Sequence, residues 1–187
     1  MFSQVYFHPV RRIYDIHLKD FLKEWLGNGL FCTKIGSHLA LTDNEVTAAF
    51  REAAFDSEKA GHIHAERIIC RKHFKKVYER NPTDETINPD AGEAVFNALC
   101  SKYDPQQVRR DKHSQKGGAS NFPVVMHDGR IESSLAVSHI LKQLPIPAVD
   151  YIFCGRDIYP EALIWVASEE MKKIIKDAVV EEEHDNG

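Results

Sequence analysis

The chain has 187 residues, of which 43% are hydrophobic and 28% are charged, and its formal net charge at pH 7 is −4. This balance is ordinary for a soluble globular protein and argues against nucleic-acid binding over the whole surface, although a local basic patch is compatible with it. The start of the chain lacks a secretory-signal pattern, and no apolar run reaches the roughly 18 residues of a membrane span. We therefore expect a cytoplasmic protein with free, mostly buried thiols at Cys32, Cys70, Cys100 and Cys154.

Helices dominate the predicted first part. His8-Pro9 predicts a helix start, because proline suits the first helical turn, and Gly27-Asn28-Gly29 predicts the end of that helix. Thr42 and Glu45 have the spacing of a capping box, which opens a second helix that runs to about Phe55. A third helix is expected over about residues 62–78, closed by Asn81-Pro82, and a fourth begins at Asn88-Pro89-Asp90.

The pattern changes after about residue 105. Residues 122–127 and 130–133 flank Asp128-Gly129, which is a strong hairpin signal. A short helix over 135–144, a strand over 149–153 and a last helix over 160–180 should follow in that order. The fold class is therefore α+β, with an N-terminal helical part and then a small mixed or antiparallel sheet packed with two helices. The predicted parts are a helical region over 1–104, a small α+β subdomain over 105–180 and a disordered acidic tail over 181–187.

The ten histidines do not have the spacing of a metal site, which normally shows close ligands on one helical face. His62 and His64 fall on different faces of the predicted helix, so capping or surface roles are favoured. His17 and His38 have no matching partner, which favours structural roles. The two His-Asp dipeptides lie at the hairpin tip (127–128) and in the tail (184–185), so we predict no metal ligands in this chain.

The strongest positive signal is a basic segment between Glu66 and Arg80. On the predicted helix, Arg67, Arg71 and Lys75 are four residues apart and stack on one face. Arginine and lysine in this arrangement suit a polyphosphate, whereas the charge count alone favours an ordinary solvated helix face. A second, weaker basic stretch contains Arg109, Arg110, Lys112 and Lys116, which we expect on a strand and a loop.

Tyr6 and His8 form the other candidate site. An aromatic ring and an imidazole two residues apart, just before a helix, could stack on a base and donate to a phosphate. The alternative is that both side chains pack in the core at the helix entry, and their spacing does not decide between the two.

These residues carry a family resemblance. Tyr6-Phe7-His8 followed by a long helix resembles the segment after the catalytic core of HD-domain phosphohydrolases, among them the deoxynucleoside triphosphate triphosphohydrolases. The later Arg71-Lys72-His73-Phe74-Lys75 is similar to that family's R-x-x-F-K element. Further likeness to bacterial members lies at the segments 88–94, 115–118 and 150–153.

The resemblance implies that Tyr6 lies beside the substrate and that His8, Arg71 and Lys75 contact the phosphates of a regulatory nucleotide, such as a dNTP or GTP. The HD core of the family binds a divalent metal ion and precedes the Tyr-x-His element, and this chain has only five residues before Tyr6. We therefore expect a C-terminal portion, truncated or split from that core, that is inactive alone. The vertebrate member of the family has a lysine where this chain has Gly155, and the neighbouring Arg156 could supply that charge.

Three functions stay open at this stage. The first is the C-terminal portion of a hydrolase, which closes the substrate pocket with Tyr6, helps to assemble a homo-oligomer and binds a nucleotide effector. The second is a free-standing module that binds nucleotides or, more weakly, nucleic acid through the same basic residues. The third is a structural subunit that docks on a separate HD protein through its first helix.

Overall fold

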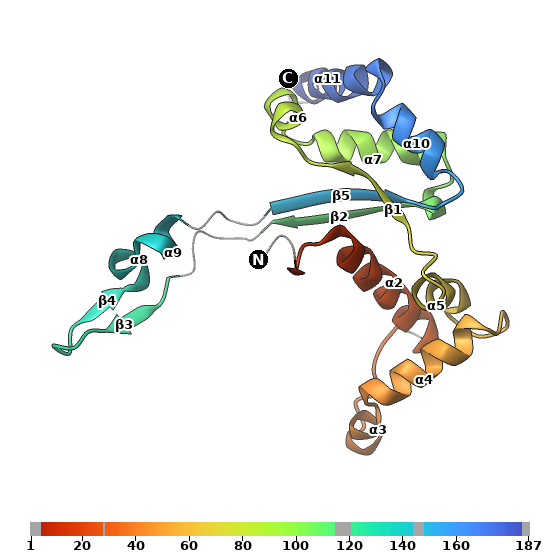
Figure 1. Cartoon of the computed structure of the whole chain (residues 1–187), viewed down its shortest axis with the longest axis horizontal. Coiled ribbons are helices and arrows are strands. Elements are labelled where there is room, and N and C mark those ends of the chain that lie inside the picture. The colour runs from red at the N-terminus through yellow and green to blue at the C-terminus, as the bar shows by residue number, and fades with distance from the viewer. Residues whose placement is uncertain (1–4, 28, 115–120, 144–147, 185–187) are drawn as a thin grey trace.

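The computed structural model describes residues 5–27, 29–114, 121–143 and 148–184, and its arrangement is shown in Figure 1. The described chain is α+β, as predicted: helices come first, a small antiparallel sheet lies at the centre, and further helices cover one side of the sheet. A separate two-stranded hairpin with two short helices projects from one end of the sheet (Figure 1). No helix among the described residues is long and apolar enough to cross a membrane.

In the described residues, the N-terminal helical part consists of α2 (Pro9–Trp25), α3 (Ile35–Ala40), α4 (Asp43–Ala54) and α5 (His62–Ile69). The predicted start signals are confirmed, because the His8 side chain accepts from the Val10 N–H and Thr42 and Glu45 form the capping box. Phe21 and Phe50 stack at 4.0 Å between ring centroids in the small core of this part. Gly61 has φ +79°, and a Cβ there would lie 2.5 Å from the Phe21 ring, so the turn before α5 requires glycine.

The helix predicted over residues 62–78 is wrong in its second half. Helix α5 ends at Ile69, and strand β1 (Lys75–Glu79) follows after a short loop. Arg71 in that loop has φ +54° and is the only non-glycine residue with positive φ in the described chain. The cations at 67, 71 and 75 therefore do not stack on one helical face, because pairing of β1 with a distant strand overrides the local helical spacing.

The central sheet has the strand order β1-β5-β2 and is antiparallel throughout. Strand β2 spans Val108–Ser114 and β5 spans Ala148–Cys154, which confirms the strand predicted over 149–153. Because β5 is central, its residue Cys154 pairs with Lys75 on one side and with Val108 on the other. The ends of all three strands thus meet near Cys154.

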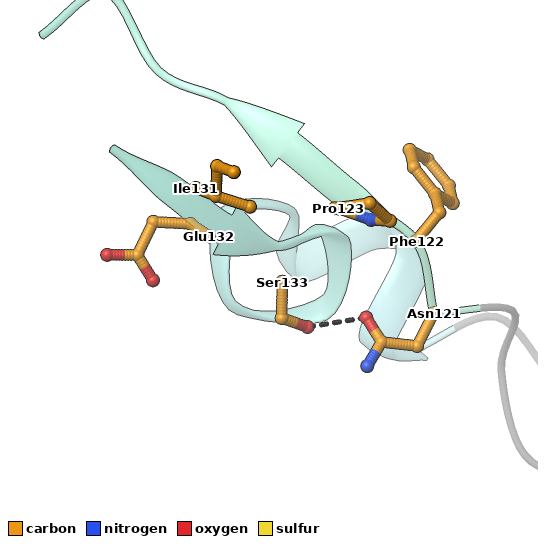
Figure 2. Close-up of a pocket in the computed structure, with 6 residues that line it drawn as sticks. All are labelled: Asn121, Phe122, Pro123, Ile131, Glu132 and Ser133. Carbon is orange, nitrogen blue, oxygen red and sulfur yellow. Dashed lines mark hydrogen bonds between the residues drawn. The ribbon is translucent and has the colours of Figure 1, made fainter. Parts of the chain in front are cut away.

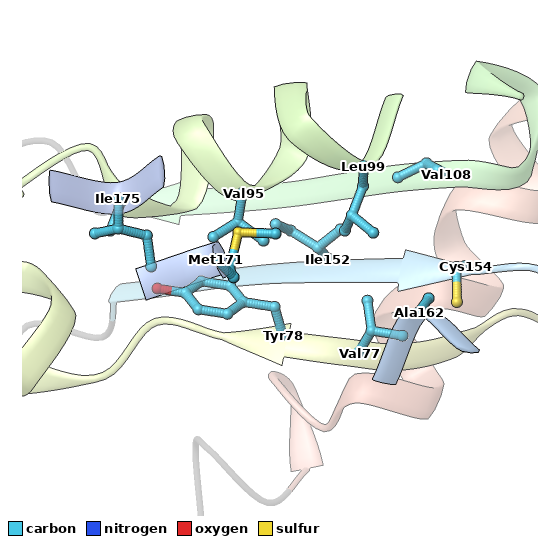
Figure 3. Close-up of a cluster of buried hydrophobic side chains, with 11 residues drawn as sticks. Val77, Tyr78, Val95, Leu99, Val108, Ile152, Cys154, Ala162, Met171 and Ile175 are labelled. Carbon is cyan, nitrogen blue, oxygen red and sulfur yellow. The ribbon is translucent and has the colours of Figure 1, made fainter. Parts of the chain in front are cut away.

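One face of the sheet is covered by apolar helix contacts (Figure 3). Helix α7 (Ala91–Lys102) places Val95 and Leu99 over Ile152, and Met171 of α11 (Glu169–His184) packs beside them. The remaining elements on this side are α6 (Pro82–Ile87), the 3-10 turn η1 (Pro105–Gln107) and α10 (Tyr159–Val166). We call this side the α7 face.

The last predicted helix is divided in two. Helix α10 ends at Val166 and α11 begins at Glu169, after which α11 continues through His184. The prediction of a disordered tail is therefore wrong for residues 181–184, which belong to the helix, and residues 185–187 lie outside the described chain. A helix that is already started extends at little cost through glutamate residues, which are good helix formers.

The opposite side of the sheet, which we call the α2 face, holds more polar contacts. Ile13 of α2 packs with Phe74, Tyr151 and Phe153 in a small buried cluster. Beside this cluster, the Arg12 guanidinium donates to both carboxylate oxygens of Asp111, at 2.5 and 2.6 Å. This bidentate pair ties α2 to strand β2.

The projecting arm spans residues 121–143. Its hairpin pairs β3 (Pro123–Val125) with β4 (Ile131–Ser133) around the predicted Asp128-Gly129 turn, which is confirmed. The short helix predicted over 135–144 is interrupted at Ser138 and forms α8 (Ser134–Val137) and α9 (His139–Gln143). Within the arm, the Phe122 N–H donates to the Ser134 hydroxyl at 3.1 Å.

Candidate functional site

Three cations gather where β1 begins and β5 ends. Lys75 pairs with Cys154 at the last rung of the ladder, so the loop before β1 lies beside the loop after β5. Arg156 Nη2 donates to the backbone carbonyl of Arg71 across these two loops. The structure therefore brings the predicted residues Arg71 and Lys75 together with Arg156. We call these three residues, Arg71, Lys75 and Arg156, the basic site.

The basic site carries an excess of positive charge. None of its three side chains forms an ion pair with a carboxylate of the described residues, whereas the neighbouring Lys72 and Lys76 pair with Glu66 and Glu79. Arg71 and Arg156 are exposed and Lys75 is half-buried. Three cations without carboxylate partners attract an anion, and two arginines and a lysine offer the forked and point-charge donors that suit phosphate oxygens.

A glycine holds the loop that carries Arg156. The Gly155 N–H donates to the carbonyl of Gln107 at 2.9 Å. A Cβ on Gly155 would lie 1.8 Å from the side-chain oxygen of Gln107 and 3.7 Å from the Phe74 ring. The close packing of Gly155 against Gln107 thus fixes the chain immediately before Arg156. Any larger residue at 155 must displace Gln107.

Two buried histidines, His17 and His73, lie close to the chain segment that carries Arg71 and Lys75. The Phe74 N–H donates to Nε2 of the fully buried His17 at 3.4 Å, and burial, followed by the charge of Arg67, lowers the pKa of His17 to about 3. His73, 9% exposed, packs its ring 4.9 Å from that of Tyr14 on α2. Burial lowers the pKa of His73, and the charges of Lys75 and Arg156 lower it further. Both imidazoles are therefore neutral near pH 7.

The other two predicted site residues lie at the start of α2. His8 is exposed, and its Nδ1 atom is occupied by the Val10 N–H at 3.3 Å. Tyr6 is half exposed, with the Arg11 guanidinium 5.4 Å from the centroid of its ring. Among the described residues, no hydrogen bond or ion pair joins His8 to the three cations. The structure therefore brings Arg71 and Lys75 together, and it leaves His8 as a capping residue.

Arg67 does not belong to the basic site. Its guanidinium lies 4.3 Å above the Phe74 ring, and burial, followed by the charge of Arg109, lowers its pKa. The second basic stretch is occupied by ion pairs on β2: Arg109 with Asp20, Arg110 with Asp150 and Lys112 with Asp90. These pairs give the β2 cations a structural role. Lys116 lies outside the described residues.

The structure differs from two further predictions, namely a capping or surface role for His64 and mostly buried thiols. His64 is buried, not at the surface, and its Nε2 atom lies 3.3 Å from Glu24 Oε1. Cys32 and Cys70 are exposed, whereas Cys154 is buried. In the part of the chain that the structure describes, no three His, Cys, Asp or Glu side chains are placed to hold a metal ion.

The arm carries a pocket of its own, lined by Asn121, Phe122, Pro123, Ile131, Glu132 and Ser133 (Figure 2). Ser133 donates a hydrogen bond to Asn121 across one side of this pocket, at 2.6 Å. The pocket is lined by residues of the arm alone and contains none of the predicted site residues.

The family resemblance points to Arg156, but no local pattern in the sequence places it beside Arg71. Only the antiparallel pairing of residues 75–79 with the predicted strand over 149–153 brings the two loops together. The helical spacing within residues 62–78 hides this pairing.

Comparison with known proteins yields a structural relationship but no family. No protein-family model matches the sequence, and no curated protein matches it. The chain is similar to a hypothetical protein from Aquifex aeolicus whose crystal structure was determined at 2.0 Å, with 28% sequence identity and a TM-score of 0.68. The match covers 88% of this chain and 41% of that chain, so this chain spans less than half of the length of that protein.

Proposed function

We propose that this chain is the C-terminal portion of an HD-type, metal-dependent phosphohydrolase similar to the dNTP triphosphohydrolases, and that its basic site binds the phosphates of a nucleotide effector. The proposed phosphate binding rests on one observation: Arg71, Lys75 and Arg156 lie together and have no carboxylate partners among the described residues. The assignment to the hydrolase class rests on the sequence resemblance at Tyr6, His8 and the R-x-x-F-K element.

In this proposal the chain performs no hydrolysis on its own. Hydrolysis belongs to the HD core, whose metal-binding histidines and aspartates would supply the divalent ion. Tyr6 is half exposed at the start of the described chain, where it can line a pocket shared with such a core. His8 contributes to the nucleotide site only if its imidazole leaves the Val10 N–H.

A binding partner is part of the same proposal. The accessible surface of the chain is 12981 Å², whereas a compact protein of 21.3 kDa exposes about 9,100 Å². Exposed apolar side chains contribute to this surface on and beside α3, where Leu30, Ile35 and Leu39 are 76%, 80% and 73% exposed. Such apolar surface is typical of an interface. We assign it to the HD core or to a second copy in a homo-oligomer.

The nucleotide site is tested by calorimetric titration of the chain with GTP and Mg²⁺ at low salt. A hydrogen bond to a charged group is worth about 1.5–3 kcal/mol, so Arg71→Ala or Lys75→Ala should weaken binding by roughly 10-fold to 100-fold. Arg130→Ala is the matched control, since Arg130 is exposed on the arm and pairs with Asp128. Binding should also weaken as salt is raised.

Two results would count against this proposal. Absence of heat with GTP and dGTP at low salt would remove the nucleotide site. Turnover of deoxynucleoside triphosphates by the isolated chain with Mn²⁺ or Mg²⁺ would contradict the assignment of hydrolysis to a separate core. Binding of oligonucleotides in preference to nucleotides would instead favour a free-standing nucleic-acid module that uses the same cations.

A further inference from the structure

The projecting arm has an apolar surface but no core of its own. Val125 of β3 and Ile131 of β4 lie directly opposite each other in the hairpin, and they are 70% and 69% exposed. Of residues 121–141, whose burial the structure describes, only Ser134 is buried. A two-stranded hairpin is marginally stable unless it packs against further structure. The exposed pair on the arm therefore needs a covering surface from outside the arm.

The pocket of Figure 2 lies on the same part of the arm. Phe122 and Ile131 belong to its apolar lining, and its volume of about 290 Å³ is at the lower limit of small-molecule sites. Asn121 and Ser133 are hydrogen-bonded to each other, which leaves Glu132 as the charged residue of the lining. Glu132 has no ion pair with another described residue. Such a pocket suits apolar side chains that are accompanied by a cation.

Helix α3 has the complementary features. All six of its residues are exposed, and Ile35 and Leu39 lie one turn apart on the same side of the helix. They are 80% and 73% exposed. Lys34, which precedes the helix, is exposed and has no ion pair within the described part of the chain. Because so short a helix is marginal in water without packing, α3 also needs a partner surface.

One chain cannot join these two surfaces, because the arm and α3 lie well apart in Figure 1. A second copy can join them. A two-fold axis that places the arm of each copy on α3 of the other forms the same contact twice and covers both surfaces. The chain also exposes more surface than a compact protein of its mass, as uncovered contacts require.

We propose that the arm of one copy docks on α3 of a second copy. Ile35 and Leu39 pack against the pocket and Ile131, in the manner of an apolar helix face in a groove, and Lys34 lies near Glu132. This inference rests on the homo-oligomer named in the proposed function and does not involve the basic site. Of the two occupants given there for the apolar surface of α3, it selects the second copy.

The contact is small, because it joins strands of three residues to a helix of six. Interfaces below about 1,200 Å² are typical of weak complexes, so dimers are expected at roughly 100 µM chain. At the low micromolar concentrations of a denaturation experiment the chain is then monomeric.

The first test is sedimentation velocity of the full chain, from about 5 to 500 µM. Ile131→Asp on the arm and Ile35→Asp on α3 should each raise the dimer Kd at least about 10-fold, because either places a carboxylate in an apolar contact. Ile164→Asp on α10 is the matched control, since Ile164 is 76% exposed and should leave the Kd unchanged. All three positions are exposed, so circular dichroism should show the same fold in each variant.

Mixing the two weakened variants identifies which surfaces meet. One variant keeps an intact arm and the other keeps an intact α3, so a mixed dimer retains one complete contact. The mixture should therefore associate more tightly than either variant alone. A contact between two arms would be insensitive to Ile35→Asp and would gain nothing from mixing, and that result would overturn the inference.

Exchange of the two charges supplies the second readout. Lys34→Glu and Glu132→Lys should each weaken association by roughly threefold or more, because like charges then meet. A chain that carries both substitutions should regain the wild-type Kd, since the pair forms again with its charges exchanged. Two weakened single variants without recovery in the double variant would contradict the contact.

The outcomes separate this inference from the proposed function. A chain that stays monomeric at 500 µM but binds GTP retains the nucleotide site and overturns the second copy as the partner of α3. A chain that dimerises through the arm and α3 but binds no GTP retains this inference and loses the nucleotide site.

Discussion

The two faces of the central sheet are built by different physical means. On the α7 face, Val95, Leu99 and Ile152 are fully buried in a continuous apolar core. On the α2 face, the apolar cluster around Phe74 is small, and the Arg12–Asp111 ion pair and the buried His17 lie beside it. The three strands are shared, so the difference arises from the alternate side chains of each strand.

This contrast separates stability from binding. An apolar core stabilises the fold through burial alone and offers no group to a ligand. The α2 face uses charged and titratable groups whose state depends on pH and on bound ions, whereas the basic site lies at the end of the sheet where Lys75 pairs with Cys154.

Substitution on the α7 face should have the largest effect. Leu99→Ala should lower the free energy of unfolding by about 2–5 kcal/mol, because it removes a fully buried side chain and leaves a cavity. Leu39→Ala, at an exposed leucine on α3, should change it by less than about 0.5 kcal/mol. Urea denaturation measures both. Equal losses in the two variants would mean that α7 does not pack on the sheet as described.

Loss of the ion pair on the α2 face should have an intermediate effect. Arg12→Gln leaves the buried Asp111 carboxylate without its bidentate partner, and about 1.5–3 kcal/mol of stability should be lost. The control is Arg11→Gln, since Arg11 and Asp15 are 3.9 Å apart with half-exposed side chains. The same denaturation measurement applies, and a loss in Arg11→Gln as large as that in Arg12→Gln would contradict this account.

The smallest effect, counted per pH unit, is the dependence of the folding stability on the protonation of His17. Burial, followed by the charges of Arg67, His64, Arg109 and His73, lowers the pKa of folded His17 to about 3, whereas the unfolded value is about 6.5. The neutral imidazole is thus favoured in the folded state. Its contribution is complete above pH 6.5 and is lost as the pH falls towards 3, by at most about 1.4 kcal/mol per pH unit.

His17→Leu should reduce this slope of stability against pH between 6.5 and 5, while His38→Leu should retain it. His38 is exposed, and its substitution removes no buried imidazole. The measurement is urea denaturation at half-unit pH steps. A slope that His17→Leu leaves unchanged would show that other groups, such as His64 and His73, account for the acid sensitivity.

Local signals in the sequence predicted much of the fold. Pro9, the Thr42–Glu45 capping box and Asp128-Gly129 each specify a start or a turn through contacts within a few residues, and the structure confirms all three. The α+β order follows from the same signals. Local chemistry decides these features, so a single sequence is enough to find them.

The basic site could be predicted only in part. The spacing of Arg67, Arg71 and Lys75 fits a helix, and nothing near Lys75 reveals that Cys154 pairs with it. That distant pairing ends α5, separates Arg67 from the site and brings in Arg156. His17, His64 and His73 also come close together only because segments that are distant in the chain pack against each other. The spacing of these histidines in the sequence therefore does not predict that they are close.

The most direct measurement of the central claim is a titration of ¹⁵N-labelled chain with GTP, followed through the arginine Nε–Hε signals. The account predicts saturable changes at Arg71 and Arg156, and none at Arg110, whose guanidinium is held by Asp150 on the α7 face. Unchanged signals of Arg71 and Arg156 at millimolar GTP and low salt, or equal changes at Arg110, would contradict it.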